Sequence, residues 1–476
     1  MQTRSAFTLL VVVISLAACA TNPVTGDREL ALVSESQEIQ IGREVAAQAE
    51  QQFGLVDDAA LQAYVHRLGF QLAQASERPE LPWAFRVVDD PTPNAFAAPG
   101  GYIFITRGLL ALLRNEAELV SVLGHEIGHV TARHSVAMMS RAQLAQLGLG
   151  IGSMLSPTVA QFGDLAAGGL QLLFLSYSRD AERQADDLGY RYALEQGYDV
   201  REMVNVFAVL QQSADMAGQS PVPSWLASHP YPEDRIARID KRLATLPATA
   251  TSGRIGEDEY LAQIDGLVYG DNPRDGYFEA NRFFHPELAF RIDLPKGWRT
   301  QNLTQAVVAG SPAEDALMQL MLVAGTLKEA ADAFFGQQGL TPGRVGTQQI
   351  NGLPAITGTF EAQTAQARLG GVVTFVSLEG RTYRILGYTP AGQQATYERT
   401  FLASMNSFAV LTNPKALARQ PQRLTIVRVR SAMTVAEFNK AHPSTVPVEE
   451  LALINQLPGP QAMMPANFKA KRVVVQ

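Results

Sequence analysis

Two histidines and a glutamate stand close together in the stretch LVSVLGHEIGHVTARH, residues 119–134. On a helix, His125 and His129 lie about 40° apart, so both imidazoles can reach one metal ion. Glu126 lies between them in the sequence and can take a proton from a water molecule held by that ion. This His-Glu-x-x-His spacing predicts a hydrolytic centre with one Zn²⁺ per chain.

A third histidine, His134, follows in the same stretch. On a continuing helix it lies about 140° away from His129. The metzincin pattern His-Glu-x-x-His-x-x-Gly-x-x-His is not met, because Ala132 and Ser135 occupy its last two defined positions. Without a glycine to turn the chain back, we expect His134 to be a surface or packing residue. The third ligand must then come from elsewhere in the chain.

Carboxylates at helical spacing occur further along, in YSRDAERQADDLGYRYALEQGYD, residues 177–199. Glu182 and Asp186 share one face of a helix. There the glutamate can complete a His₂Glu zinc site, and the aspartate can orient a ligand imidazole. Alternatively, the two acids pair with Arg179 and Arg183 on a solvated helix face. Spacing alone leaves both alternatives open.

The N-terminal sequence predicts export. Arg4 precedes an apolar run over residues 7–16, which is too short to span a bilayer. The alternative is a marginal N-terminal anchor. Cys19, the only cysteine, follows Leu16-Ala17-Ala18, and this resembles the lipobox of bacterial lipoproteins. The resemblance implies acylation of Cys19, and several acyl chains anchor a protein stably. The lack of an aspartate directly after Cys19 implies, by the same resemblance, a tether on the periplasmic side of the outer membrane.

Composition bounds the remaining possibilities. A chain of 476 residues predicts two or three domains. Its 46% hydrophobic and 18% charged residues exclude a disordered protein and a polytopic membrane protein. A net charge of −7 without a basic run excludes nucleic acid as a partner.

The elements that must position the candidate site are mainly helices. Apolar spacing predicts helices over residues 37–76, and strands flank the turn DPTP, the second at Tyr102–Thr106. Helices then dominate to about Leu246. Alternating β-type runs fill residues 277–411, beyond a linker. The apolar stretch over 149–178 is interrupted and is interpreted as a lid, a surface for a partner or membrane, or plain core.

Three motifs, NAFAAPGGYIFITRGLL, ELVSVLGHEIGHVTARH and SRDAERQADDLG, follow one another in the order found in HtpX- and BepA-like zinc metallopeptidases. The chain resembles this family, the bacterial relatives of CAAX prenyl proteases, over about residues 30–245. The resemblance implies a mainly helical, gluzincin-type domain with a small edge sheet. It implies Glu126 as general base and Asp186 behind the ligands. The zinc ligands that it implies are His125, His129 and Glu182.

The same resemblance implies how substrate is held and how the site is closed. The strand Asn94–Thr106 would align a peptide by β-augmentation. Its substrate-binding residues would be Asn94, Ala95, Phe96 and Ala97. The segment WLASHPYPEDRIARI resembles the His-Pro segment of the family, in which His229 can occupy the open zinc position and keep the enzyme latent. Alternatively, His229 or Arg235 donates to the developing oxyanion, or the segment is a helix-start turn.

Two further resemblances concern the C-terminal half. HPELAFRIDLPKGW and INGLPAITGTF are similar to PsbP-like α/β domains. The tail resembles a LysM module, a βααβ fold that binds peptidoglycan, although Ala432-Met433-Thr434 replaces its usual Gly-Asp-Thr. The α+β chain is therefore divided into a lipoprotein signal peptide (1–18), a tether (19–35), a zinc metallopeptidase domain (36–246), a PsbP-like domain (255–412) and a LysM-like module (422–476).

These features predict a periplasmic, outer-membrane-tethered zinc endopeptidase. Its substrates would be misfolded or stalled cell-envelope proteins. The alternative is a chaperone or scaffold for outer-membrane protein assembly, with a mostly latent zinc site and the assembly machinery as partner. A peptidoglycan-anchored structural lipoprotein is a third interpretation.

Overall fold

A computed structural model describes residues 19–146, 176–217, 225–230, 232–245, 253–363 and 367–475. The predicted signal peptide and residues 149–175 of the apolar stretch 149–178 lie outside these ranges. The chain separates into unit 1, which holds the residues up to Gly270 with Arg423–Val475, and unit 2, which holds Asp271–Gln422. Both units mix helices and strands, which confirms the predicted α+β multidomain class. Among the described helices, none combines the length and apolar character that a membrane crossing requires.

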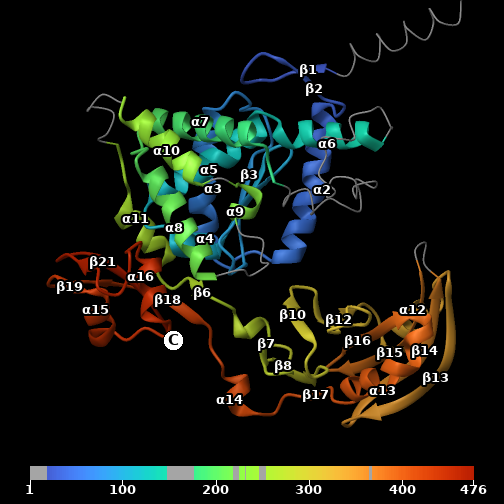
Figure 1. Ribbon diagram of the computed structural model, residues 1–476. Coiled ribbons are helices and arrows are strands. Elements are labelled where there is room, and N and C mark those ends of the chain that lie inside the picture. The colour runs from blue at the N-terminus through green and yellow to red at the C-terminus, as the bar shows by residue number, and fades with distance from the viewer. Residues whose placement is uncertain are drawn as a thin grey trace, which may run out of the picture. The chain divides into compact units, whose positions relative to one another are not determined.

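Unit 1 is rich in helices (Figure 1). Its helices are α2 (Glu35–Phe53), α3 (Ala59–Gln74), α4 (Arg107–Leu112), α5 (Glu116–Thr131), α6 (His134–Gln146), α7 (Arg179–Glu195), α8 (Glu202–Ala217), α9 (Trp225–Ser228), α10 (Pro232–Leu243), α11 (Glu257–Ile264), α15 (Val435–Ala441) and α16 (Val448–Ile454). Its strands are β1 (Cys19–Thr21), β2 (Arg28–Leu30), β3 (Ala84–Val88), β4 (Ala95–Ala98), β5 (Tyr102–Thr106), β6 (Val268–Tyr269), β18 (Gln422–Arg428), β19 (Met433–Thr434), β20 (Met463–Met464) and β21 (Lys469–Val475).

Helix α5 carries the His-Glu-x-x-His motif and is buried along its whole length. It begins after Asn115, whose side chain accepts a hydrogen bond of 2.8 Å from the Glu118 backbone nitrogen. This cap satisfies one of the free N–H groups of the first turn, and the acids Glu116 and Glu118 suit the positive end of the helix dipole. The motif is therefore on a rigid element inside the core.

Glycines let α7 pack unusually close to α5. A side chain at Gly189 would come within 2.8 Å of the His125 backbone nitrogen, and one at Gly124 within 3.0 Å of the Gly189 Cα atom. Glu182 and Asp186 lie on the same face of α7 as Gly189, at helical spacing. The close packing therefore brings both carboxylates to the histidines of α5.

A three-stranded sheet has the order β3-β5-β4, with β3 parallel and β4 antiparallel to β5. The expected strand Asn94–Thr106 is thus two strands, and only β4 is at the edge. The chain turns between them because Gly100 and Gly101 take φ values of 74° and 105°, which favour glycine. Of the two strands, β5 lies in the middle of the sheet and β4 at one edge, with β3 at the other.

The C-terminal segment of unit 1 packs into the same core as the motif helix. Its strands β18 and β21 form a sheet with β6, in the order β21-β18-β6. Lys471 of β21 is fully buried and donates hydrogen bonds of 2.7 and 2.7 Å to the carbonyl oxygens of Ala111 and Leu113. These carbonyls end α4 just before α5 begins, so the last strand of the chain anchors the start of the motif helix.

Residues 255–270 also pack with unit 1 rather than with unit 2. Tyr260 of α11 is fully buried and donates a 2.6 Å hydrogen bond to the Leu110 carbonyl oxygen. The compact unit that follows therefore starts at Asp271, after the boundary at residue 255 that composition indicated.

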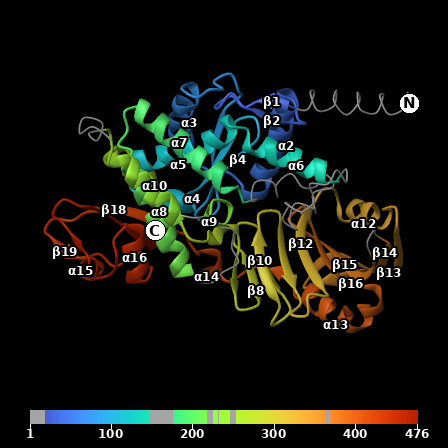
Figure 2. The ribbon, with the colours of Figure 1, turned by 45° about the horizontal axis from the view of Figure 1, so that its top comes forward.

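Unit 2 is built on an antiparallel sheet of order β10-β11-β12-β16-β15-β14-β13, beside a smaller one of order β17-β9-β8-β7. Helices α12 and α13 pack on opposite faces of the large sheet (Figure 2). The strands are β7 (Tyr277–Glu279), β8 (Arg282–His285), β9 (Phe290–Asp293), β10 (Arg299–Leu303), β11 (Ala306–Gly310), β12 (Leu317–Val323), β13 (Leu340–Ile350), β14 (Leu353–Gln363), β15 (Arg368–Leu378), β16 (Arg381–Pro390) and β17 (Ala409–Val410). The helices are η4 (Pro273–Asp275), α12 (Leu327–Phe335), η5 (Ala391–Gln393), α13 (Gln394–Met405) and α14 (Pro414–Leu417).

Candidate metal centre

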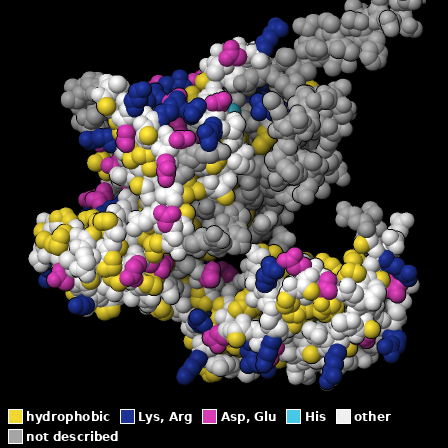
Figure 3. All heavy atoms as spheres, viewed as in Figure 1, with side chains coloured by type: hydrophobic (Ala, Val, Ile, Leu, Met, Phe, Trp, Pro, Cys, Tyr) yellow, Lys and Arg dark blue, Asp and Glu magenta, His cyan; other side chains and the backbone are white. Residues whose placement is uncertain are grey.

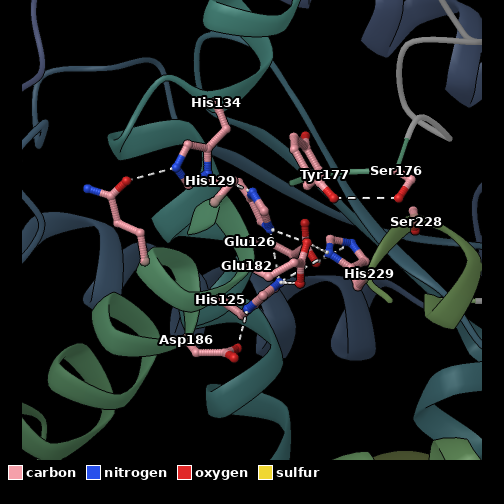
Figure 4. Close-up of polar contacts among 12 residues, drawn as sticks. His125, Glu126, His129, His134, Ser176, Tyr177, Glu182, Asp186, Ser228 and His229 are labelled. Atoms are coloured by element: carbon pink, nitrogen blue, oxygen red, sulfur yellow. Dashed lines mark hydrogen bonds and ion pairs between the residues drawn. The ribbon is translucent and has the colours of Figure 1, made fainter. Parts of the chain in front are cut away.

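Four side chains converge between α5, α7 and α9, and each is about 1% exposed (Figure 4). They are His125, His129, Glu182 and His229, and one potential ligand atom from each lies within 4.8 Å of all the others. Sequence reasoning had named all four, although spacing alone did not decide for Glu182. The close packing of α7 on α5 brings Glu182 to the histidines.

The distances within this group fit a tetrahedral metal. Ligand atoms 2.0–2.1 Å from zinc at the tetrahedral angle lie about 3.3 Å from one another. His125 Nε2 lies 3.0 Å from His129 Nε2 and 3.2 Å from His229 Nδ1. Glu182 carboxylate oxygens lie 3.6 and 3.5 Å from His125 Nε2 and His129 Nε2, and 3.0 Å from His229 Nδ1. All five separations are near the expected edge length.

The donor chemistry gives a second test. The other ring nitrogens of His125 and His129 have their own hydrogen-bond partners, Asp186 and His134. With a proton on each of those outer nitrogens, both Nε2 atoms turn lone pairs toward one another. Two lone pairs at 3.0 Å repel unless a cation lies between them. The donor set therefore fits a zinc ion.

Asp186 supports His125 from behind. Its Oδ1 lies 2.9 Å from His125 Nδ1, and Arg235 donates to both of its oxygens at 2.6 and 2.9 Å. Burial acts to raise the pKa of Asp186, but the Arg235 guanidinium and His125 hold it well below its usual range. Asp186 is therefore an anion that fixes the ring of His125.

His134 partners the outer ring nitrogen of His129, as Asp186 partners that of His125. Its Nδ1 lies 2.9 Å from His129 Nδ1, and its Nε2 lies 3.0 Å from Gln184 Oε1. His134 is thus a packing residue, as expected, although the chain turns here without a glycine. Arg133 takes a φ of 57° without being glycine, so α6 starts in a new direction. His134 is nevertheless outside the group of four converging ligand atoms.

Tyr177 stacks on His129, with ring centroids 3.9 Å apart and an angle of 25° between the planes. Its hydroxyl lies 3.0 Å from Ser135 Oγ, directly after His134. Sequence reasoning gave Tyr177 no role, because the motif that contains it was read for carboxylates. The sequence feature that could have indicated this role is the position of an aromatic residue directly before Ser178, the N-cap of the helix that carries Glu182.

Glu126 lies beside the group but outside it. Its Oε1 accepts a 3.4 Å hydrogen bond from Trp225 Nε1 and lies 3.5 Å from His229 Nε2. Its Oε2 is buried and has no hydrogen-bond partner among the described residues. A carboxylate with one free oxygen next to a metal position is suited to take a proton from water.

The segment around α9 closes this side of the centre. The Trp225 backbone nitrogen donates to the Pro93 carbonyl oxygen at 3.2 Å, just before Asn94 and β4. Arg235 of α10 lies 3.0 Å from Glu182 and stacks over the Trp225 ring, with 4.6 Å between its Cζ and the ring centroid. His229 and Arg235 are thus both in the centre, and neither is a surface turn residue.

Histidine protonation differs across the centre. Burial and the neighbouring histidines hold the pKa of His129 well below its ordinary value. Burial also acts to lower the pKa of His229, but Glu182 and Glu126 outweigh it and raise that pKa above the ordinary value. Two carboxylates therefore attract positive charge to the position of His229.

The model of peptidase family M48 matches residues 59–243. The chain is 30% identical over 258 residues to the beta-barrel assembly-enhancing protease of Escherichia coli K12, covering 52% of each protein. It is 29% identical over 187 residues to the mitochondrial metalloendopeptidase OMA1 of Schizosaccharomyces pombe, covering 38% of this chain and 52% of that protein. The chain thus spans about half the length of these curated relatives. A solution structure of cyanobacterial PsbP from Synechocystis sp. PCC 6803 covers 28% of this chain and 94% of its own, at 14% identity and a TM-score of 0.24.

The match to the family model covers the segment that contains all four converging side chains. The family and relative matches confirm the predicted relationship to HtpX- and BepA-like metallopeptidases. Zinc is the metal that such peptidases use, and the donor set fits it. Residues 59–243 therefore match peptidase family M48, and the buried donor set within them fits zinc.

Proposed function

We propose that this protein is a zinc endopeptidase of the bacterial cell envelope that cleaves misfolded or stalled envelope proteins. The observation that carries the proposal is the buried convergence of His125, His129 and Glu182 beside the free carboxylate oxygen of Glu126. Family M48 and the names of the relatives, proteases and metalloendopeptidases, support the reaction class.

Bound zinc would polarise the scissile carbonyl and lower the pKa of the attacking water. Glu126 would take the proton of that water and pass it to the leaving amine. Asp186 would keep His125 in the ligating tautomer. Trp225 would orient Glu126 through the hydrogen bond to its Oε1.

The substrate would lie as an added strand along β4. This strand is at the edge of its sheet, so one row of backbone groups is not used by a neighbouring strand. Asn94, Ala95, Phe96 and Ala97 would be the contact residues. The buried Asn94 Oδ1 has no hydrogen-bond partner among the described residues, and it could accept one from a peptide N–H.

His229 would hold the enzyme latent by taking the fourth zinc position. Its Nδ1 lies at the same distances from His125 and Glu182 as a fourth tetrahedral ligand would. Departure of His229 would open that position for water. The competing role is donation by His229 or Arg235 to the oxyanion of the transition state.

The parts outside the M48 domain would set location. Lipidated Cys19 would tether the chain to the outer membrane, facing the periplasm, and unit 2 would be a PsbP-like domain. The segment after residue 422, with α15 and α16 between the strand pairs β18, β19 and β20, β21, would be the LysM-like module. This module would be the contact with peptidoglycan. The name of the Escherichia coli relative points to proteins of β-barrel assembly as substrates or partners.

A chaperone or scaffold with a mostly latent zinc site is the second candidate. It is favoured by the closed donor set, in which His229 leaves no position for water. Binding of unfolded chains along β4 without cleavage would then be the main activity.

Cleavage of a labelled unfolded protein separates these candidates, with the full chain purified in detergent and its zinc content measured. We expect Glu126→Gln to retain zinc and to lose about 10²–10⁴-fold in cleavage rate. If it cleaves as fast as the wild type, the peptidase mechanism is wrong.

His229→Ala tests the closing residue in the same assay. An inert wild type with an active His229→Ala variant supports latency. An active wild type with an inert variant supports the oxyanion role. If both proteins bind zinc, neither cleaves, and both suppress aggregation of the unfolded substrate, the chaperone candidate stands.

A further inference from the structure

Among the described residues, no carboxylate partners the outer nitrogen of His129, unlike that of His125. The partner is another imidazole, His134, at 2.9 Å between the two Nδ1 atoms. Figure 4 shows His134 behind His129, on the side away from Glu182 and His229. A side-chain amide, Gln184 of α7, follows at 3.0 Å from His134 Nε2. His129, His134 and Gln184 thus form a hydrogen-bonded series that leads from the candidate metal centre to α7.

We propose that His134 is a positioning residue that fixes the ring orientation and the tautomer of His129. The proposal rests on the zinc site of the proposed function. It assigns to His134 no contact with zinc or substrate.

The directions of the hydrogen bonds in this series follow from Gln184. Gln184 Oε1 can only accept, so His134 Nε2 must carry the proton of its ring. A neutral His134 then has a lone pair on Nδ1 and accepts from His129 Nδ1. His129 Nε2 is left without a proton, with its lone pair pointing to His125 and Glu182. One amide oxygen therefore sets the ligating tautomer of His129 through His134.

The backbone that delivers His134 is fixed by a buried acid. Arg133 is in the left-handed region, which is unfavourable for a residue other than glycine. Its Nε donates to Glu38 Oε2 at 3.0 Å, and a terminal nitrogen donates to the Val33 carbonyl oxygen at 3.0 Å. Glu38 is 1% exposed and also accepts from Arg78 at 2.8 Å. The hydrogen bonds from Arg133 to Glu38 and to the Val33 carbonyl oxygen therefore stabilise the unfavourable turn.

The turn also fixes the face of the His129 ring. Ser135, the next residue, holds the hydroxyl of Tyr177, and the Tyr177 ring stacks on His129 at 3.9 Å. His134 therefore restrains the edge of the imidazole while Ser135 and Tyr177 restrain its face.

A neutral partner suits the charge of the site. Glu126, Glu182 and Asp186 already bring three carboxylates into a buried space that contains one guanidinium, Arg235. A fourth carboxylate behind His129 would add an uncompensated buried charge. An imidazole orients the ligand without that cost.

Zinc affinity of the full chain, measured by competition with a chromogenic chelator, tests the proposal. We expect His134→Ala to bind zinc about 10–100-fold more weakly, the usual effect of losing such a partner. His134→Asn places an amide oxygen near the former Nδ1 and should recover most of the affinity. His66→Ala removes a histidine elsewhere in unit 1 and is the matched control. If His134→Ala binds zinc as tightly as His66→Ala, the proposal is wrong.

A metal-free readout separates this inference from the proposed function. In ¹⁵N-histidine-labelled protein without zinc, the ring nitrogen shifts of His129 should report a proton on Nδ1 in the wild type. That preference should be lost in His134→Ala and kept in His134→Asn. A proton on Nε2 in the wild type overturns the proposal, whatever the peptidase assays show. A protein that shows the expected tautomer but cleaves nothing contradicts the proposed function alone.

Discussion

His125 and His129 lie one turn apart on α5, and their outer nitrogens meet different chemistry. Behind His125 are a carboxylate and a guanidinium, Asp186 and Arg235, joined by two hydrogen bonds. Behind His129 are a neutral imidazole and an aromatic ring, His134 and Tyr177. We call these the charged side and the neutral side of the centre.

The charged side is held by ion pairs between α7 and α10, and the neutral side by a strained turn and ring stacking. The charged side gains strength from the low dielectric of the core, but it loses most when one member is removed. The neutral side adds no charge and depends on backbone geometry instead. A buried metal group can thus be oriented by two different physical means within one helical turn.

Asp186→Asn breaks the charged side and should have the largest effect. Asparagine can still accept from His125, but Arg235 loses its main anion inside the core. Loss of one member of a buried pair costs about 3–5 kcal/mol, and zinc affinity should fall by about 10–100-fold. Thermal unfolding and chelator competition measure the two effects.

Asp187→Asn is the matched control for that change. Asp187 is the next residue on α7 and pairs with Arg238 and Arg242, all of them about 40% exposed. Such surface pairs contribute at most about 1 kcal/mol. Lys and Arg side chains gather over α7 and α10 in Figure 3, where these pairs lie. Equal destabilisation by the two variants would remove the distinction between a buried and an exposed ion pair.

Removal of zinc by a chelator acts on both sides at once. A ligand that binds only the folded state stabilises it by about 2.7 kcal/mol at a concentration 100 times its Kd. We expect hydrogen exchange to quicken along α5 and α7 after chelation, because both helices supply ligands. Exchange in the large sheet of unit 2 is the internal control. An equal increase there would mean that chelation unfolds the chain without regard to the site.

Glu118→Gln probes the first turn of α5, outside both sides, and should have a smaller effect. Burial raises the pKa of Glu118 to about 7, above its ordinary 4.5. A pKa that is higher in the folded state gives stability that is complete below pH 4.5 and declines as the pH rises through about 7. The free energy of unfolding of the wild type should therefore carry a falling component in that window.

The Glu118→Gln variant should lose that component, as urea titrations at several pH values will measure. Glu195→Gln, an exposed glutamate of α7, should keep the wild-type pH dependence. Zinc affinity at constant pH should be unchanged in both variants. A drop in affinity for Glu118→Gln would show that the helix start also adjusts the site.

Gln184→Leu weakens the neutral side and should have the smallest effect. His134 keeps its bond to His129 but loses the acceptor that places the proton on its Nε2. Zinc affinity should fall a few-fold, below the about 10–100-fold range for loss of a direct partner. A fall as large as that of His134→Ala would mean that Gln184 acts on the site by another route.

Sequence reasoning reached the charged side because it depends on helical periodicity. Glu182 and Asp186 share a face of α7 at a spacing visible in the sequence, and the resemblance to the family gave them roles. Periodicity could not supply the distance between the helices, which depends on Gly124 and Gly189 facing one another. Nothing in a single sequence indicates that these two glycines face one another.

The neutral side was missed because its decisive feature is a tertiary one. The prediction for His134 assumed that only glycine turns a helix end sharply. Arg133 makes the turn instead, held by Glu38 from the other end of the domain. For β4 and β5, the sequence shows two glycines, Gly100 and Gly101, where the chain turns, but it does not show that the two strands pair with each other.

Lys471 sets a requirement on the order in which the domain can form. Its ammonium group caps carbonyl oxygens that lie 358 and 360 residues earlier in the chain, immediately before α5. Contacts of such long sequence separation are typical of slow folding, because the intervening loop must close first. All of unit 2 lies within that loop. The helix that carries His125 and His129 thus gains the Lys471 contact only after all of unit 2 has been synthesised.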